Sequence, residues 1–123
     1  MSHDRRRIGK LGENEACLRL QASGYTIREM NWRCRSGEID IIAELEGRIV
    51  FIEVRTRRLS GLGRFGTAAE SIDYRKQQQV RRVAQSYMQF EKLLNRPIRF
   101  DAIAISLAER DRIHSFVHYE AAF

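Results

Sequence analysis

The sequence predicts an α/β fold in which a mixed β-sheet is flanked by helices. Three observations support this prediction: an amphipathic helix near the N-terminus, a β-rich hairpin, and a second amphipathic helix followed by two further strands. The expected order of elements is α-β-β-β-α-β-β. The 123 residues are 43% hydrophobic with one proline, so residues 1–123 are expected to form one domain, with its core at about 8–119 and a basic N-terminal tail at 1–7.

Two segments have helical periodicity. Residues 7–22 carry an imperfect apolar stripe, and Ser23-Gly24 supplies a stop. Residues 72–94 carry apolar side chains at intervals of three and four residues, with Lys and Arg on the other faces, and Pro97 closes this region. These segments are the two expected helices.

The expected strands are β-rich or alternating runs. Two of them flank Glu46-Gly47, where glycine can adopt the positive φ of a tight hairpin. After the hairpin, residues 57–69 contain Gly61, Gly63 and Gly66 and are expected to form a flexible, basic loop. The strands are expected at residues 25–31, 38–45, 48–56, 98–107 and 113–119.

The formal net charge of +6 favours a polyanionic partner, such as nucleic acid or an anionic membrane surface. The basic residues are partly sorted into groups along the chain, although a scattered, solvated surface is the alternative. The candidates for nucleic-acid binding are Arg33, Arg35, Arg57, Arg58, Lys76 and Arg81.

The sequence has no apolar run near the ~20 residues that a membrane helix needs, and its start lacks a secretory signal. We therefore expect a soluble, cytoplasmic protein. Cys17 and Cys34 show no metal-ligand spacing, which suits two reduced thiols in a reducing compartment.

The hairpin carries the most informative polar residues. If Glu46-Gly47 is a two-residue turn, Asp40 lies directly opposite Glu53, and both carboxylates point to one face, close enough to share an ion. Glu38 and Arg55 would oppose each other on the same face. Mg²⁺ suits two carboxylates because it keeps several waters that can attack a phosphate. The other face would be apolar and belong to the core: Ile39, Ile41, Ala43, Val50, Ile52 and Val54.

Two alternatives stay open at this point. A three-residue loop with a bulge at Gly47 would shift the register and place Glu53 opposite Ile39. Alternatively, Asp40 and Glu53 form ion pairs with nearby arginines on a solvated sheet.

Residues 37–43 (GEIDIIA) and 50–57 (VFIEVRTR) resemble the signature of the bacterial YraN family of uncharacterised proteins. The resemblance covers roughly residues 8–107. Its further matches are Gly12-Glu13, Ala16, Gly24-Tyr25, Asn31, Arg33, Lys76, Ala84 and Arg99-Phe100-Asp101.

That family is similar to archaeal Holliday-junction resolvases and other PD-(D/E)xK nucleases, so the resemblance implies a restriction-endonuclease-like fold. It implies Asp40 and Glu53 as metal-binding catalytic residues, with Glu13 from the first helix as a third ligand and Glu15 as its rival. Glu38 would then have a supporting role. The implied cofactor is Mg²⁺ or Mn²⁺, the implied partner is DNA, including branched DNA, and a homodimer is an assembly to test.

One residue departs from the family pattern: Arg55 stands where the family usually has lysine. Arginine supplies charge and bidentate phosphate contacts but does not lose a proton. Three outcomes follow: Arg55 acts as an electrostatic clamp in catalysis, Lys76 takes over the role of the lysine, or the protein binds nucleic acid without cleaving it. A protein-interaction domain with a basic surface is a further, less supported hypothesis.

Two other features have structural interpretations that compete with functional ones. His114 and His118 are four residues apart, but they lie in an expected strand rather than a helix, which disfavours a metal pair. Trp32 could stack on an unpaired base, although a single tryptophan more commonly anchors a core or a sheet edge.

Overall fold

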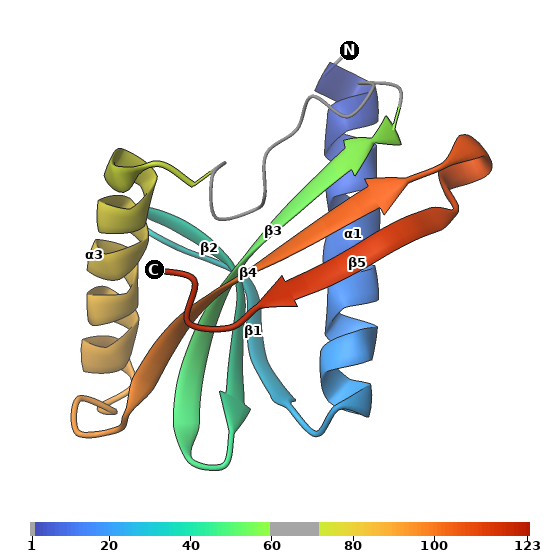
Figure 1. Cartoon of the computed structure of the whole chain (residues 1–123). Helices are drawn as coiled ribbons and strands as arrows, with labels where there is room; N and C mark the ends of the chain where they lie inside the picture. Colours follow the sequence, from blue (N-terminus) through green and yellow to red (C-terminus); the bar gives the residue numbers. More distant parts are fainter. Residues whose placement is uncertain (1, 60–71) are drawn as a thin grey trace.

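The computed structural model describes residues 2–59 and 72–123. It confirms the predicted mixed α/β architecture and the predicted order of elements (Figure 1). Arg57 and Arg58, predicted to begin the loop, belong to the third strand, while the glycines of that loop lie outside the described residues. The elements are α1 (Ser2–Ala22), β1 (Thr26–Cys34), β2 (Gly37–Leu45), β3 (Arg48–Arg58), α3 (Tyr74–Phe90), β4 (Ile98–Leu107), the 3-10 turn η2 (Glu109–Asp111) and β5 (Ile113–Tyr119).

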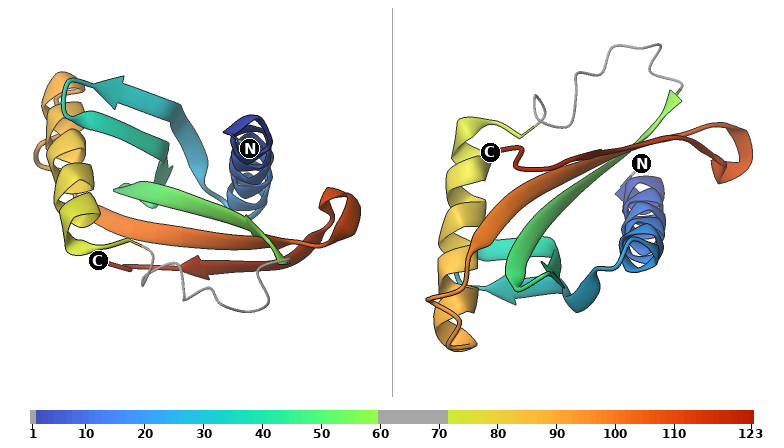
Figure 2. Two further views of the ribbon diagram at one scale, coloured as in Figure 1. Left: turned by 90° about the horizontal axis from the view of Figure 1, so that it is seen from above. Right: turned by 60° about the horizontal axis from the view of Figure 1, so that its bottom comes forward.

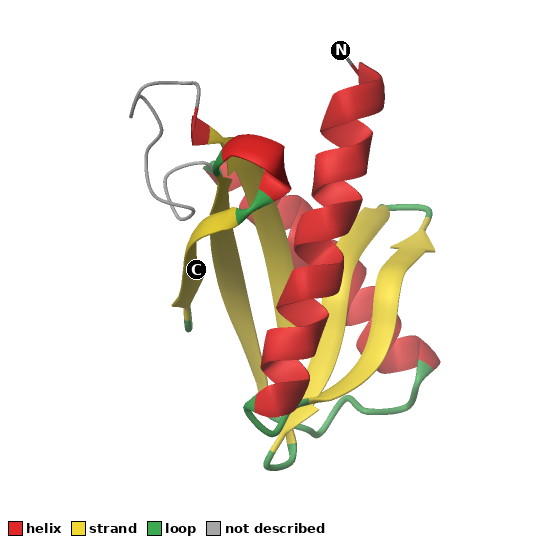
Figure 3. Ribbon diagram, turned by 90° about the vertical axis from the view of Figure 1, so that its right-hand side faces the viewer, coloured by secondary structure: helices red, strands yellow, loops and turns green. Residues whose placement is uncertain are grey.

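The five strands form one sheet in the order β1-β2-β3-β4-β5. Strands β1, β2 and β3 are antiparallel neighbours, β3 and β4 are parallel, and β4 and β5 are antiparallel. A parallel pair needs a crossover connection, and α3 lies in it. Helix α1 covers one face of the sheet and α3 covers the other (Figures 2 and 3).

Two hydrophobic clusters fill the spaces between sheet and helices. On the α1 side the buried residues are Ile8, Ala16, Cys17, Leu20, Tyr25, Ile41, Ala43, Val50, Ile52, Ile103, Ile105 and Leu107. On the α3 side they are Ile39, Ile42, Ile49, Phe51, Val80, Val83, Ala84, Tyr87, Met88 and Phe100. Both faces of the hairpin are therefore covered, and few places remain where a charged side chain on it can meet solvent.

The prediction that Ile39 shares the sheet face of Ile41 and Ala43 is wrong. Ile39 packs in the hydrophobic cluster on the α3 side, whereas Ile41 and Ala43 pack on the α1 side. The pairing of β2 with β3 ends at Ile41–Ile52. Beyond that point β2 pairs only with β1, so the regular alternation of the hairpin does not extend to Ile39.

The predicted start of the first helix is also wrong, since α1 begins at Ser2 and residues 2–7 are helical rather than a basic tail. Ion pairs hold this part of the helix: Arg58 of β3 pairs with Asp4 at 2.9 Å and with Asp111 at 2.8 Å, and Arg7 also contacts both carboxylates. Apart from the Arg7–Asp4 pair, these ion pairs join residues that are far apart in the sequence. Apolar periodicity therefore could not predict that residues 2–7 are helical.

Helix α3 is shorter than the predicted 72–94. Its N-cap is Asp73, whose side chain accepts a hydrogen bond from the Lys76 N–H at 2.9 Å. The helix ends at Phe90, and Lys92 has a φ of 60°, which stops helical propagation. Within residues 2–59 and 72–123, no helix is long and apolar enough to cross a membrane.

Helix α1 approaches β3 closely at Gly12. A Cβ at this position would overlap Thr56 Oγ1 and lie 3.0 Å from Thr56 Cβ, so only glycine allows this approach. Gly12→Ala is expected to lower the free energy of unfolding by roughly 1–3 kcal/mol through overpacking, as measured by urea denaturation. The control is Gly9→Ala, where an added Cβ meets no atom of residues 2–59 and 72–123 within 4 Å. An equal loss of stability in both variants would contradict the packing argument.

Candidate active site

The β2–β3 turn has the predicted two-residue geometry. Leu45 pairs with Arg48 and the ladder continues without a shift to Ile41–Ile52. Glu46 and Gly47 have φ values of 51° and 83°, as a two-residue hairpin turn with two left-handed residues requires. The bulge alternative is therefore excluded, and the register brings Asp40 and Glu53 together.

The hairpin opens just beyond Ile41–Ile52, because β2 continues along β1 while β3 continues along β4. The two carboxylates fill this opening. Asp40 Oδ2 accepts a hydrogen bond from the Val54 N–H at 2.8 Å, and the Asp40 N–H donates to Glu53 Oε2 at 3.3 Å. Each acid thus binds the backbone of the opposite strand, and these contacts satisfy N–H groups that have left the ladder.

The predicted opposition of Glu38 and Arg55 is wrong, because the hairpin has already opened at that level. Glu38 instead pairs with Arg33 of β1, both across the strand ladder and through an ion pair of 3.3 Å. This contact leaves Asp40 and Glu53 as the acidic pair of the hairpin.

Both carboxylates are destabilised in their charged form. Glu53 is 2% exposed, and burial together with the charge of Asp40 raises its pKa to about 7, against the opposing effects of Lys76 and Arg55. Burial also raises the pKa of Asp40, although the Val54 N–H, Lys76 and Arg55 favour its charged form. A pair of desolvated acids with incomplete cationic compensation is characteristic of functional sites.

Lys76 lies next to this pair. Its Nζ is 3.5 Å from Glu53 Oε1 and 3.4 Å from Gln79 Oε1. The N-terminal half of α3 is fixed against the sheet because Gln79 Nε2 donates to the Ser36 carbonyl at 3.2 Å, in the β1–β2 connection. Helix α3 therefore delivers an ammonium group to Glu53 from outside the hairpin.

Arg55 contributes a second cation. Its charge lowers the pKa of both Asp40 and Glu53. Its Nε is buried and has no hydrogen-bond partner among residues 2–59 and 72–123. A buried donor without a partner is uncommon in folded proteins, and it is available to a ligand.

Glu13, rather than Glu15, is the α1 acid beside the site. Its Oε1 accepts a hydrogen bond from Asn31 Nδ2 at 3.1 Å, and burial followed by the charge of Asp40 raises its pKa. Glu15 pairs with Arg19 at 2.9 Å. In the part of the chain that the structure describes, no three His, Cys, Asp or Glu side chains form a metal-binding group; Glu13 is an electrostatic neighbour of the Asp40–Glu53 pair.

The structure distributes the six predicted nucleic-acid-binding residues unevenly. Lys76 lies at the carboxylate pair, and Arg33, Arg35 and Arg57 are exposed. Arg58 is held by Asp4 and Asp111. The Arg81 guanidinium lies over the Phe100 ring at 4.7 Å and the Phe123 ring at 5.6 Å.

Sequence reasoning missed Lys10 and did not assign a role to Asn31. Asn31 lies within β1 but has a φ of 53°, a conformation that asparagine tolerates better than most residues. Its side chain accepts a hydrogen bond from Lys10 Nζ at 2.8 Å while donating to Glu13. The presence of asparagine within a sequence typical of a β-strand was the signal that could have pointed to this unusual backbone conformation.

The remaining sequence candidates have structural roles. Asp101 is fully buried and accepts hydrogen bonds from Arg99 at 2.8 Å and the Ala121 N–H at 2.9 Å, while His118 Nε2 lies 2.7 Å from its Oδ2. Burial alone would raise the pKa of Asp101, but these partners hold it below its ordinary value. Trp32 packs edge-on against Tyr87, with ring centroids 5.1 Å apart. Cys17 and Cys34 are free thiols.

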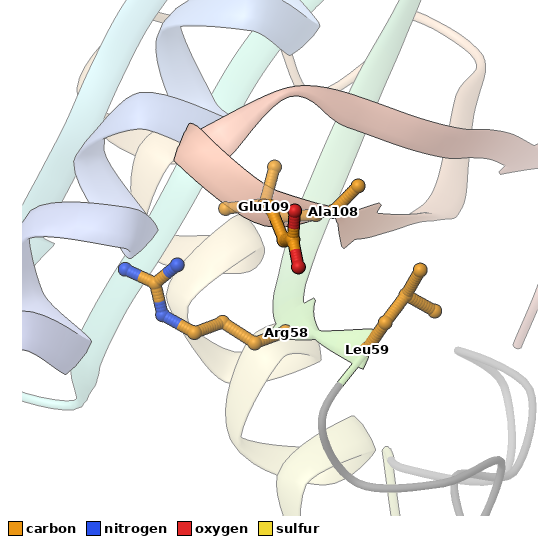
Figure 4. A pocket seen from close by; sticks show the side chains of 5 residues that line it. Arg58, Leu59, Ala108 and Glu109 are labelled. Atoms are coloured by element: carbon orange, nitrogen blue, oxygen red, sulfur yellow. The ribbon is translucent and has the colours of Figure 1, made fainter.

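A separate cavity of about 430 Å³ lies at the end of β3 (Figure 4). Among the described residues its lining is mainly aliphatic, with the Glu109 carboxylate at its edge, and the Arg58 side chain reaches away toward α1. Because Arg58 is already paired with Asp4 and Asp111, the described residues of this cavity offer no set of converging reactive groups. The chemistry of the protein is better sought at the carboxylate pair.

The raised pKa of Glu53 has a consequence for stability. Between the ordinary carboxyl pKa of 4.5 and the folded-state value of about 7, the folded protein binds more protons than the unfolded chain, so stability falls as pH rises through this window. Glu53→Gln is expected to be more stable than the wild type by about 2 kcal/mol at pH 8 without metal, with the difference closing toward pH 5. Urea denaturation in EDTA at several pH values measures this; a difference that is independent of pH would contradict it.

Comparison with known proteins identifies the family. Residues 12–105 match the model of the uncharacterised protein family UPF0102. A UPF0102 protein of Moorella thermoacetica is 44% identical over 123 residues and covers all of both chains. A UPF0102 protein of Alkaliphilus oremlandii is 42% identical, covering 96% of this chain and 98% of the relative, and one of Hahella chejuensis is 46% identical over 100 residues. The chain therefore belongs to the UPF0102 family, the family that its hairpin motifs resemble.

Proposed function

We propose that this protein is a metal-dependent phosphodiesterase that cleaves DNA, including branched DNA, with a restriction-endonuclease-like arrangement of its active site. The observation that carries the proposal is the contact between Asp40 and Glu53 where the hairpin opens, with Lys76 3.5 Å from Glu53. The net charge of +6 supports a polyanionic substrate.

The donor set fits Mg²⁺ or Mn²⁺. Such hard cations take carboxylate oxygens, and Mg²⁺ commonly uses only one or two protein carboxylates and retains several waters. Asp40 and Glu53 would hold the ion, and the nearby charge of Glu13 would increase the affinity of the site. The raised pKa values of all three acids support this assignment, because burial, together with the charge of neighbouring acids, disfavours their charged forms and a divalent cation would favour them. When bound, the ion supplies a nucleophilic water and positive charge for the phosphate.

The side chains of this protein would contribute the remaining chemistry. Lys76 is placed to orient the attacking water beside Glu53, and Arg55 to stabilise the negative charge that develops on the phosphate. The buried Nε of Arg55, which has no hydrogen-bond partner in the described part of the chain, supports a role in ligand contact. In this assignment Lys76 takes the role that the family resemblance implies for a lysine at position 55. Arg55 then needs to supply only positive charge.

Purified protein should be tested with Mg²⁺ or Mn²⁺ on linear, flapped and four-way-junction DNA. The proposal predicts cleavage that requires the metal and stops in EDTA. Absence of cleavage under every condition, with the Arg55→Lys variant equally inert, would overturn it.

A second candidate function is nucleic-acid binding without turnover, which the arginine at position 55 supports because a guanidinium does not deprotonate. This alternative predicts salt-sensitive DNA binding that survives Asp40→Asn, since phosphate contacts would carry the affinity. Detection of a cleavage activity that Asp40→Asn removes, with binding intact, would favour the phosphodiesterase.

A further inference from the structure

A groove of about 300 Å³ is lined by residues of α1, β1 and β2, among them Glu13 and Glu38, whose charges interact with that of Asp40. Its basic lining comes from Arg6 and Lys10 of α1 and Arg33 of β1. Glu13 and Glu38 also line it, but Asn31 and Lys10 face the first, and Arg33 pairs with the second. The groove therefore presents the positively charged groups of Arg6, Lys10 and Arg33. The carboxylates of Glu13 and Glu38 in its lining already have hydrogen-bond or ion-pair partners.

Gly9 lines this groove without a packing reason to be glycine. An added Cβ at Gly9 would meet no atom of the described residues within 4 Å, in contrast to Gly12, where Thr56 leaves no room. Glycine inside a helix lowers its stability relative to alanine. Gly9 leaves the backbone of α1 uncovered at the groove, which suits close approach of a ligand.

Asn31 links the groove to the candidate active site. Its side chain holds Lys10 Nζ at 2.8 Å on one side and Glu13 Oε1 at 3.1 Å on the other. It does so from a left-handed conformation, with φ of 53°, inside strand β1. Non-glycine residues in this conformation concentrate at ligand and active sites, and here the hydrogen bonds of the Asn31 side chain fix the ammonium group of Lys10 relative to Glu13.

We propose that this groove binds a backbone phosphate of the nucleic-acid strand that passes the Asp40–Glu53 pair. Lys10 contacts the phosphate directly, Arg6 and Arg33 contribute charge, and Gly9 provides the space for the strand against α1. The inference rests on the proposed function in taking the ligand as nucleic acid, and it names the path of that strand toward the site.

The test compares Lys10→Gln with Arg5→Gln, a matched removal of one positive charge from an exposed position of α1 outside the groove. Binding of fluorescently labelled DNA is measured by anisotropy in EDTA over a series of salt concentrations. Lys10→Gln is expected to weaken binding about five- to tenfold and to reduce the slope of log affinity against log salt by about one. Arg5→Gln is expected to change affinity less than about twofold.

Gly9→Ala provides an independent arm. It is expected to raise the melting temperature by a few degrees, because alanine favours the helix, and to weaken DNA binding severalfold by filling the groove. Reduced binding by a more stable protein cannot result from unfolding. Gly9→Gln, which fills more of the groove, should weaken binding further.

Wild-type affinity in either Lys10→Gln or Gly9→Ala would overturn the groove proposal. An equal loss of affinity in Arg5→Gln would also overturn it, because it would indicate non-specific electrostatic attraction. Because binding is measured without metal or cleavage, the two proposals fail separately. Loss of binding in Lys10→Gln without any nuclease activity would leave the groove standing, whereas metal-dependent cleavage with unchanged binding in Lys10→Gln would overturn the groove alone.

Discussion

Replacing Asp40 with Asn, or Glu53 with Gln, is expected to lower the rate of metal-dependent DNA cleavage by roughly three orders of magnitude, the scale seen when a preorganised charge-stabilising group is removed. Each change removes one of the two carboxylates that meet at the hairpin opening. Both variants should remain folded, because the new amide oxygens can still accept the Val54 and Asp40 N–H groups. Single-turnover cleavage at saturating enzyme measures the effect.

The first helix supplies a matched control. Glu13→Gln is expected to lower the cleavage rate, because the Glu13 carboxylate interacts with Asp40, whereas Glu15→Gln should leave it unchanged, because Glu15 pairs with Arg19. Undiminished cleavage by Asp40→Asn or Glu53→Gln would move the catalytic centre elsewhere in the protein.

Lys76→Met is expected to lower cleavage by roughly 100-fold, a typical contribution of a positioned catalytic group. The reason is that Lys76 Nζ lies 3.5 Å from Glu53 Oε1. Helix α3 therefore places the Lys76 ammonium group in contact with the acidic pair. Adding Arg55→Lys to the Lys76→Met variant is expected to recover part of the lost rate, because it places an ammonium group at the position on β3 whose charge acts on both acids.

Arg75→Met is the control for this comparison, since Arg75 is the exposed neighbour of Lys76 on the same helix. Cleavage rates of all variants are compared at equal metal concentration and across pH. Full activity in Lys76→Met together with loss of activity in Arg55→Met would show that Arg55, and not Lys76, carries the role.

The fold was predictable where local chemistry decides it. Turn residues Glu46-Gly47 fix a two-residue hairpin, and its register up to Ile41–Ile52 directs Asp40 and Glu53 toward each other. The ranges predicted for the last two strands, residues 98–107 and 113–119, agree with β4 and β5. In these places periodicity and turn geometry agree with the tertiary structure.

The remaining features depend on contacts between distant segments. Residues 2–7 are helical and are held by ion pairs with Arg58 and Asp111, which no apolar stripe signals. The hairpin opens because β2 continues along β1 and β3 continues along β4. The sequence of the hairpin therefore could not predict that Glu38 pairs with Arg33 rather than lying opposite Arg55. The contact of Lys76 with Glu53 likewise requires the docking of α3 through Gln79.

We propose that Asp40 and Glu53 together bind a divalent cation. The most direct test is the anomalous difference map of crystals soaked in Mn²⁺ at pH 8, above the pKa of about 7 to which burial raises Glu53. We predict a peak between the two side chains, with oxygen ligands at about 2.1 Å as in comparable Mg²⁺ sites. A map with Mn²⁺ bound elsewhere and no peak at this pair would contradict the account.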